Sequence, residues 1–335
     1  MLIYFLNFII IALLVILVIY FGAITIIRRY LDHLIKNLNI VSTSFFDKRF
    51  KDIIDSFKVG FYSTIKLHLN YQKIRKSLDD TFQPYIQGFA YEGTGMGFGL
   101  RSTFHLKSAK QFEKYINRLS PQHIYQYYVG LGWWLQTIYG FNLKRYSKWL
   151  KNLDTMYGPI LFDGVGFKIG IFAYKENPQI LEKAYLLGNN NCRVFYQGFG
   201  RSLWFQKKFQ IDEVLLEIEK LPEEFKRDCM SGVGLAVAYS FFDRIGLSFI
   251  TANSVPEKYK DAFIQGMAFG WEARRLQHSE YWVKTLNETT DEIKQFVYQV
   301  LGYVHRSKDQ INNKKNEDFY FCWIDQTREL IKTRA

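Results

Sequence analysis

Three charged residues occupy related places in a recurring glycine pattern of this 335-residue chain. Glu92 and Asp163 each stand immediately before a glycine, and Arg201 stands three residues after one. In a helix these positions share one edge. Burial can turn either carboxylate into an acid or a base, and the arginine can hold an anion, so these three are the catalytic candidates. The alternative interpretation is a set of surface charges or an internal ion pair that joins helices.

Large apolar side chains stand on the same helical edge. If such edges line the inner surface of a curved helical array, they form an aromatic wall with a few polar groups, which suits a long apolar ligand with a polar end. A large enclosed cavity at the charged residues would favour ligand binding or catalysis, whereas ion pairs to neighbouring helices would favour a scaffold. The predicted ligand-binding residues are Met96, Trp133, Phe167, Gln197, Trp204 and Phe269.

The sequence contains no conventional catalytic constellation. Its six histidines are scattered and lack helical pairing at three or four residues, so we expect no metal site. The run Gly93–Gly99 resembles a dinucleotide-binding turn, but such a turn follows a strand and opens a helix. Because this run lies inside a predicted helix, we expect no cofactor.

The elements that position these residues follow from the glycines. Gly130, Gly164, Gly198 and Gly232 recur every 34 residues, and each belongs to a Gly-x-Gly pair. Apolar residues stand three before, one after and five after the first glycine, a spacing that predicts a helix through each pair. A helical glycine costs about 1 kcal/mol relative to alanine, so we expect a compensating approach of two backbones. The structural glycines are Gly93, Gly95, Gly130, Gly132, Gly164, Gly166, Gly198, Gly200, Gly232, Gly234 and Gly266.

Each glycine helix leaves room for a second, shorter helix before the next. The predicted second helices follow the residues Ser108, Asn142, Asn177, Ile211 and Asp243. A degenerate first copy centres on Gly60, with Phe57 and Ile65 at two of its apolar positions. The sequence therefore predicts an all-α fold of about six to seven 34-residue helix pairs, of tetratricopeptide-like length, in an α-solenoid or a closed helical ring.

The N-terminus reads as a membrane anchor. Residues 2–27 carry no charge and are long enough to cross a hydrocarbon core of about 30 Å. Arg28, Arg29 and Lys36 follow this run and nothing basic precedes it, which predicts a single-pass anchor in the bacterial cytoplasmic membrane with the C-terminal part in the cytoplasm. Residues 28–80 hold 11 Lys and Arg against 6 Asp and Glu, and we expect them to face anionic lipid headgroups.

The domain plan follows from these elements. We expect an anchor at 1–27, basic juxtamembrane helices with the degenerate repeat at 28–78, a helical-repeat domain at 79–305, and a polar linker with a short C-terminal helix at 306–335. Within the last part, residues 291–305 read as a capping helix, 306–318 as an exposed linker and 319–331 as a helix whose aromatic residues dock on the array or on a partner. The net charge of +12 comes without a nucleic-acid-binding motif, so we expect no nucleic-acid partner.

Four segments resemble a known family. They are Gly88–Gly93, Asp163–Phe167, Gln197–Phe205 and Ser231–Ala236, and the likeness extends from about residue 53 to residue 275. The sequence is similar to a bacterial family of unknown function labelled "enediyne biosynthesis protein". The resemblance implies a setting in secondary-metabolite biosynthesis of the enediyne or polyketide type, and it supplies no reaction.

Three functions remain open from the sequence. The first is a membrane-anchored accessory protein that binds a lipophilic intermediate or a partner enzyme. The second is an enzyme that acts on a polyene-like apolar substrate inside a helical ring, with Glu92 or Asp163 as acid or base and Arg201 as anion clamp. The third is a protein-interaction scaffold without a small ligand. The sequence reveals neither the substrate nor the partner.

Overall fold

The computed structural model describes residues 2–40, 44–66, 68–312 and 318–333, without the side chains of residues 2, 3, 8, 9, 12, 13, 16, 17 and 312. Every regular element in these ranges is helical, which confirms the all-α prediction. The chain divides into two compact units, Met1–Thr43 and Ser44–Ala335. Each unit is described below by itself.

The described residues of the first unit form one helix, α1 (Leu2–Asn37), of 36 residues. Apolar side chains along it are exposed, among them Phe5, Val18 and Ile26, with exposed fractions of 63%, 71% and 69%. In the described parts of the chain, no single helix has both the length and the hydropathy of a membrane span. One bent pair does, formed by Glu223–Ser240 and Phe242–Asn253 at an angle of 78°.

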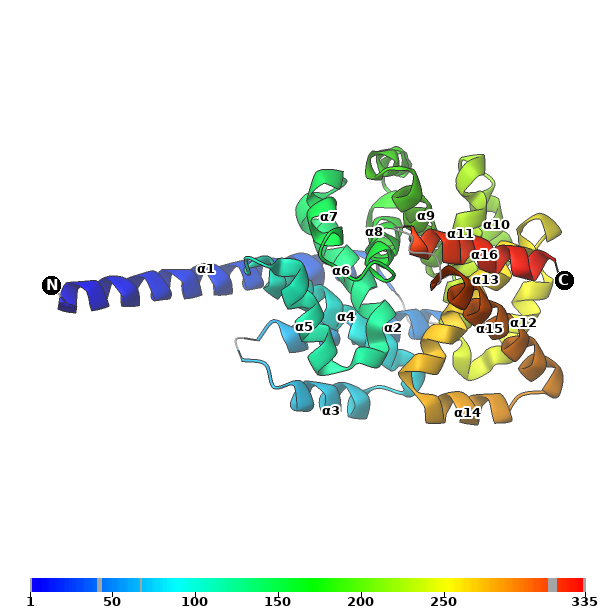
Figure 1. The fold of residues 1–335 in the computed structure, drawn as a ribbon, viewed down its shortest axis with the longest axis horizontal. Helices are drawn as coiled ribbons and strands as arrows, with labels where there is room; N and C mark the ends of the chain where they lie inside the picture. The colour runs from blue at the N-terminus through cyan, green and yellow to red at the C-terminus, as the bar shows by residue number, and fades with distance from the viewer. Residues whose placement is uncertain (1, 41–43, 67, 313–317, 334–335) are drawn as a thin grey trace. The chain divides into compact units, whose positions relative to one another are not determined.

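Seven helices carry the recurring glycines of the second unit, and we call them the glycine helices. Each packs against the next one along the chain, so the order in sequence is also the order of contact (Figure 1). The fourth continues into a π-helical turn, η3 (Gly170–Tyr174). The glycine helices are α2 (Phe45–Thr64), α4 (Pro84–Thr103), α6 (Ile124–Tyr139), α8 (Leu161–Ile169), α9 (Asn189–Gln206), α11 (Glu223–Ser240) and α13 (Glu257–Gln277).

The glycines bring neighbouring backbones into direct contact. A Cβ atom built on Gly198 would lie closer than 3.0 Å to the carbonyl oxygen of Asp163, and one on Gly200 equally close to that of Cys229. The first glycine of a pair thus faces the helix before it, and the second faces the helix after it. The same relation holds at Gly95, Gly130, Gly132, Gly164, Gly166, Gly232, Gly234 and Gly266. The predicted close approach of backbones is confirmed at these positions.

The register predicted for the degenerate first copy is wrong. Gly60 packs on the carbonyl of Ala90, and Gly93 packs on the carbonyl of Phe57. Gly60 therefore takes the place of a second glycine, equivalent to Gly95, and Lys58 stands where the first would be. Phe57 accordingly occupies the position immediately before the pair. The sequence contains a single glycine here, and one glycine does not reveal which member of the pair it is.

Shorter helices connect the glycine helices. Those at the predicted places are α5 (Ser108–Leu119), α7 (Leu143–Leu150), η4 (Pro178–Leu187), α10 (Ile211–Ile218) and α12 (Ile245–Asn253). Asn142 caps α7 because its side chain accepts a hydrogen bond from the backbone N–H of Arg145 at 3.3 Å. The other connections are α3 (Tyr71–Thr81) and the short 3₁₀ turns η1 (Pro121–His123), η2 (Gly158–Ile160) and η5 (Phe242–Arg244). Helix α14 (Ser279–Asn287) follows the last glycine helix.

Two further helices complete the unit, α15 (Asp291–Asn312) and α16 (Phe319–Lys332). The predicted linker at 306–318 is wrong in its first half, because α15 continues through Asn312 with Ser307 and Ile311 buried. Residues 313–317 lie outside the described ranges. The aromatic cluster of α16 docks on the helices of its own unit, since Trp323 donates to the carbonyl of Val304 at 2.9 Å and lies 4.5 Å from the ring of Phe269.

Candidate functional site

The three charged residues singled out from the sequence meet inside the second unit. Arg201 of α9 forms an ion pair with Asp163 of α8, and its second terminal nitrogen lies 3.4 Å from a carboxylate oxygen of Glu92 in α4. All three side chains are buried, with exposed fractions of 5% or less. The guanidinium carbon also lies 4.8 Å from the ring centre of Phe167. The structure therefore brings these residues together as an internal ion pair that links three helices.

Burial and mutual charge shift the acidity of this ionic cluster, which consists of Glu92, Asp163 and Arg201. Burial raises the pKa of Glu92 to about 7, an effect that Arg201 opposes and the Asp163 carboxylate reinforces. Burial also raises the pKa of Asp163, against the influence of Arg201. For Arg201, burial lowers the pKa, but the two carboxylates outweigh this effect and raise it. Glu92 can therefore exchange a proton near neutral pH.

Two polar atoms of the ionic cluster are not satisfied by the described residues. Asp163 Oδ2 and Arg201 Nε are both buried and have no hydrogen-bond partner there. A buried polar atom without a partner costs about 1–3 kcal/mol, so such atoms point to a bound water or to a ligand. The space available decides between these two.

A cavity of about 40 Å³ adjoins the ionic cluster. One water occupies about 30 Å³ of liquid, whereas pockets for drug-sized ligands measure about 300–1,000 Å³. In this conformation the cavity therefore has room for water but not for a drug-sized ligand. Besides the ionic cluster, its lining comprises Tyr125, Gln126, Val129, Ile160, Gln197, Leu235, Tyr239, Phe269, Ala273 and Tyr320.

The predicted ligand-binding residues fall into two groups. Gln197 and Phe269 line the cavity, and Gln197 donates weakly to the Tyr320 hydroxyl at 3.5 Å. Met96 is 1% exposed. The other aromatic residues fill the interior: Trp133 lies 4.3 Å from Phe57 and 5.6 Å from Phe167, and Trp204 packs on Phe209 and Phe241. These rings form a packed core around the ionic cluster.

The family comparison gives this arrangement a place among known sequences. A family model described as "Protein of unknown function (DUF1702)" matches residues 40–324, which is most of the chain. The chain belongs to the DUF1702 family. No curated protein and no solved structure matches it. The family is uncharacterised, so the chemistry of this DUF1702 protein has to be argued from its own residues.

Sequence reasoning missed a second buried arginine, Arg274 of α13. Its side-chain nitrogens donate to the carbonyl oxygens of Tyr239 at 2.6 Å, Pro84 at 3.2 Å and Tyr85 at 2.6 Å. It also stacks on the Tyr239 ring, with 3.6 Å from the guanidinium carbon to the ring centre. Burial lowers its pKa. Arg274 thereby joins α13 to α11 and to the start of α4.

Lys168 is another buried cation that the sequence did not reveal. Its amine donates to the side chains of Gln136 at 2.7 Å and Thr137 at 2.5 Å. Burial lowers the pKa of Lys168 to about 7. It stands four residues after Gly164, and apart from Asp163 it is the only charged residue of α8, which was the available signal.

A second group of ion pairs holds α16 in place. Asp228 of α11 binds Arg193 of α9 at 3.0 Å and Arg328 of α16 at 2.8 Å, and Arg328 also donates to Gln265 at 3.0 Å. Asp325 of α16 pairs with Arg193 as well. These contacts fix the helix that supplies Tyr320 to the cavity.

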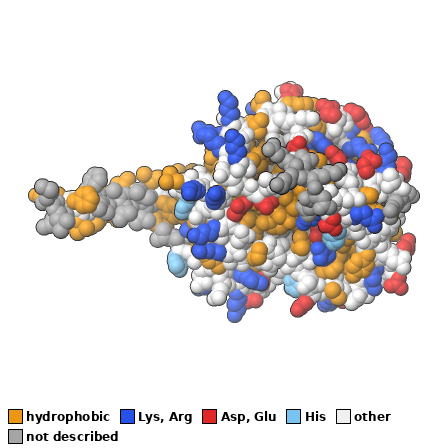
Figure 2. Space-filling view, viewed as in Figure 1, with side chains coloured by type: hydrophobic (Ala, Val, Ile, Leu, Met, Phe, Trp, Pro, Cys, Tyr) orange, Lys and Arg blue, Asp and Glu red, His pale blue; other side chains and the backbone are white. Residues whose placement is uncertain are grey.

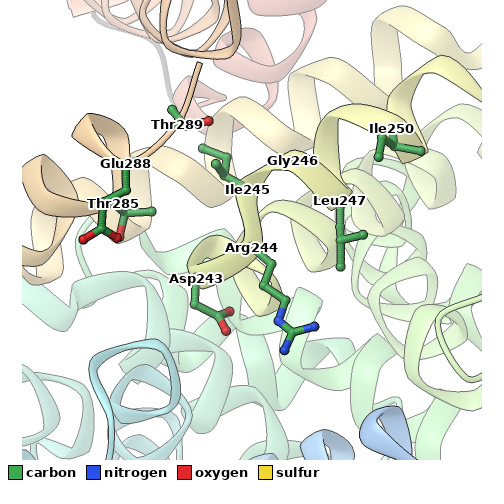
Figure 3. A pocket seen from close by; sticks show the side chains of 9 residues that line it. All are labelled: Asp243, Arg244, Ile245, Gly246, Leu247, Ile250, Thr285, Glu288 and Thr289. Carbon is green, nitrogen blue, oxygen red and sulfur yellow. The ribbon is translucent and has the colours of Figure 1, made fainter. Parts of the chain in front are cut away.

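A shallow groove of about 550 Å³ lies on the outside of the DUF1702 protein, between α12 and α14. Figure 3 shows Ile245, Leu247 and Ile250 projecting from the α12 side, with Arg244 and Asp243 below them and Glu288 across the groove. The side chains of Leu247 and Ile250 are 39% and 63% exposed. The groove therefore combines apolar surface with charges of both signs, a composition found at protein interfaces.

Proposed function

We propose that this DUF1702 protein is a non-catalytic accessory protein that binds a partner protein through its short outer helices. One observation carries the proposal. Four successive short helices, η4, α10, α12 and α14, each expose a large apolar side chain to solvent. These side chains and their exposed fractions are Leu186 at 63%, Leu216 at 63%, Ile250 at 63% and Val283 at 52%.

Exposed apolar groups that recur along an array are typical of a partner surface, because repeat proteins bind through extended faces. The groove beside Ile250 extends this surface with Leu247, Arg244 and Glu288. The interior supports the same assignment, since a 40 Å³ cavity is far smaller than a lipophilic intermediate requires. A partner protein is therefore favoured over a small apolar ligand.

The contacts across the interior support a closed ring over an open superhelix. Arg274 connects α13 with the start of α4, and Arg201 connects α9 with the middle of α4. Both contacts join helices that are far apart in the sequence. In this proposal the ring is a rigid support for the outer helices, and the ionic cluster stabilises the ring by linking α4, α8 and α9.

The proposal places the protein at the bacterial cytoplasmic membrane, with the second unit in the cytoplasm. Residues 2–27 carry no charge, they belong to the continuous helix α1, and basic residues follow them. The resemblance to the enediyne label supports a biosynthetic partner enzyme of the polyketide type. Tethering such an enzyme would concentrate a lipophilic pathway at the membrane surface.

Photo-crosslinking of the full chain in its native bacterium tests the partner surface. A crosslinking amino acid replaces Leu216 or Ile250 in one strain each, and replaces Thr155, an exposed residue outside the outer surface, in a control strain. We expect one discrete protein adduct from positions 216 and 250 and none from 155. Equal crosslinking at all three positions, or adducts at none, contradicts the proposal.

An enzymatic function is the second candidate, and the proton exchange of Glu92 near pH 7 supports it. The Glu92→Gln variant decides between the two. If it folds, keeps the crosslinks at 216 and 250 and still supports product formation in the host pathway, the accessory function holds. Loss of product with retained crosslinks assigns catalysis to Glu92.

A further inference from the structure

A second pocket lies on another part of the surface, between the start of α5, the end of α6 and helix α7. Its volume is about 310 Å³. Trp149 is buried in its wall, and Tyr139 is half-buried beside it. Leu106 and four cationic residues complete the lining that matters here: Lys107, Lys110, Arg145 and Lys148.

The charge of this pocket is entirely positive. Lys107, Lys110, Arg145 and Lys148 are all exposed, and within the described parts of the chain none of them forms an ion pair with a carboxylate. Figure 2 shows Lys and Arg side chains gathered over α5 and α7. Four exposed cations around one hollow give it a positive potential, which attracts a negatively charged group.

The surrounding sequence does not neutralise these cations. Between residues 107 and 153 the only acidic residue is Glu113. Its carboxylate is already engaged, since it accepts from the Tyr128 hydroxyl at 2.9 Å and from the backbone N–H of Asp154 at 2.6 Å. The positive potential of the pocket is therefore left for an external anion.

We propose that this pocket binds the phosphate headgroup of an anionic membrane phospholipid. The four cations are opposite in sign to the phosphate, and lysine and arginine are the usual donors to phosphate oxygens. The exposed apolar residues Leu106 and Phe104, which we call the rim, favour a lipid over free phosphate as the ligand. Leu106 is fully exposed at the edge of the pocket, and Phe104 beside it is 54% exposed.

The rim fits the boundary between headgroups and acyl chains. An apolar side chain buried there gains about 25 cal/mol for each Å² removed from water, whereas free phosphate offers no such surface. Basic residues near an anionic membrane surface add to this attraction, and salt screens their contribution. The residues that line the pocket differ from those of the outer helices of the proposed function, so the pocket adds a lipid contact within the folded second unit.

Native mass spectrometry of the full chain tests the lipid site. The protein is reconstituted in nanodiscs of equal phosphatidylcholine and phosphatidylglycerol, and the retained lipids are counted after release. In the test variant, glutamine replaces Lys107, Lys110, Arg145 and Lys148. In the control variant, glutamine replaces four exposed cations elsewhere, Lys175, Lys183, Arg306 and Lys332, so that both variants lose the same charge.

We expect the test variant to retain phosphatidylglycerol about tenfold less well than the unaltered chain, and the control to match the unaltered chain. Equal losses in the two variants overturn the site, because they would mean a general charge effect. Circular dichroism verifies that both variants fold, as exposed positions predict.

The rim is tested by Leu106→Asn in the same nanodiscs. We expect retention of phosphatidylglycerol to fall at least about threefold, and 10 mM inorganic phosphate, a concentration of about 10⁴ times a typical micromolar constant, to leave the unaltered chain's lipid in place. Displacement by inorganic phosphate together with no effect of Leu106→Asn overturns the assignment to a lipid, since the site would then recognise phosphate alone.

Discussion

Two buried arginines cross the interior of the second unit, and they are held in different ways. Arg201 faces the carboxylates of Glu92 and Asp163. Arg274 faces the carbonyl oxygens of Tyr239, Pro84 and Tyr85 together with the Tyr239 ring. Both join helices that are distant in sequence. The partners of Arg201 can gain a proton, whereas backbone carbonyls cannot.

The difference teaches that two buried arginines, each joining distant helices, respond differently to pH. The carboxyl of Glu92 exchanges its proton near pH 7. Protonation weakens its attraction to Arg201 but also removes the larger cost of burying its charge, so this junction changes with pH. The dipoles of carbonyl groups around Arg274 do not change with pH. The first junction is therefore an adjustable contact and the second a constant one.

Removal of the charge at Arg201 has the largest expected effect on this comparison. Arg201→Met leaves two buried carboxylates without their cation, and breaking a buried pair in this way costs about 3–5 kcal/mol. Denaturant unfolding of the detergent-solubilised full chain at pH 8 measures the loss. Arg227→Met is the matched control, because Arg227 pairs with Asp261 at the surface and such pairs contribute about 1 kcal/mol or less. Equal losses would show that Arg201 is not buried against its partners.

The titration of Glu92 has the next largest expected effect on the free energy of unfolding. Its pKa is about 7 in the folded protein and about 4.5 in the unfolded chain, so the folded state binds the proton more tightly. The contribution of Glu92 to stability is therefore greatest below pH 4.5 and decreases as the pH rises to 7, by up to about 3 kcal/mol. We expect Glu92→Gln to flatten the stability curve between pH 5 and pH 8. An unchanged slope would assign the titration to another group.

Arg274→Met tests whether the junction at Arg274 is independent of pH. The substitution removes charged donors from three carbonyl oxygens, and we expect a loss of about 2–3 kcal/mol. Because no carboxylate pairs with Arg274 in the described residues, the loss should be the same at pH 5 and at pH 8. Unfolding curves at the two pH values measure this difference. A penalty that varies with pH by more than about 1 kcal/mol would erase the distinction between the two arginines.

Tyr320→Phe has the smallest expected effect. The hydroxyl accepts a long hydrogen bond of 3.5 Å from Gln197, so its removal should cost less than about 1 kcal/mol. Thermal unfolding followed by circular dichroism measures the change. A larger loss would show that α16 is coupled to the ionic cluster more strongly than its contacts indicate.

The glycine spacing predicted the part of the fold that repeats. Gly130, Gly164 and Gly198 lie in helices and face neighbouring backbones. The sequence could predict this because the absence of a Cβ atom at regular spacing is visible in each segment by itself. The spacing also placed Glu92 and Asp163 on related edges. It could not show that Arg201 reaches a carboxylate 109 residues away, because that contact depends on how far the array curves.

The remaining features had weak or misleading signals. Arg274 contacts Tyr85 across 189 residues and follows no period, so only the structure reveals its role. The side chains of Trp133 and Phe167 are buried, and a position on a helical edge does not distinguish a cavity wall from a packed core. The register predicted for the degenerate copy at Gly60 was wrong for a simpler reason, since a single glycine is compatible with two registers.

One matched pair of substitutions tests most directly that glycines hold neighbouring helices at backbone contact. Gly198 faces the carbonyl of Asp163 closer than a Cβ permits, whereas Gly246 in α12 has nothing within 4 Å of a Cβ. The free energy of unfolding is measured for Gly198→Ala and Gly246→Ala in the full chain. We predict a loss of about 3 kcal/mol for the first and no loss, or a gain of up to about 1 kcal/mol, for the second. Equal values for the two variants would contradict the account.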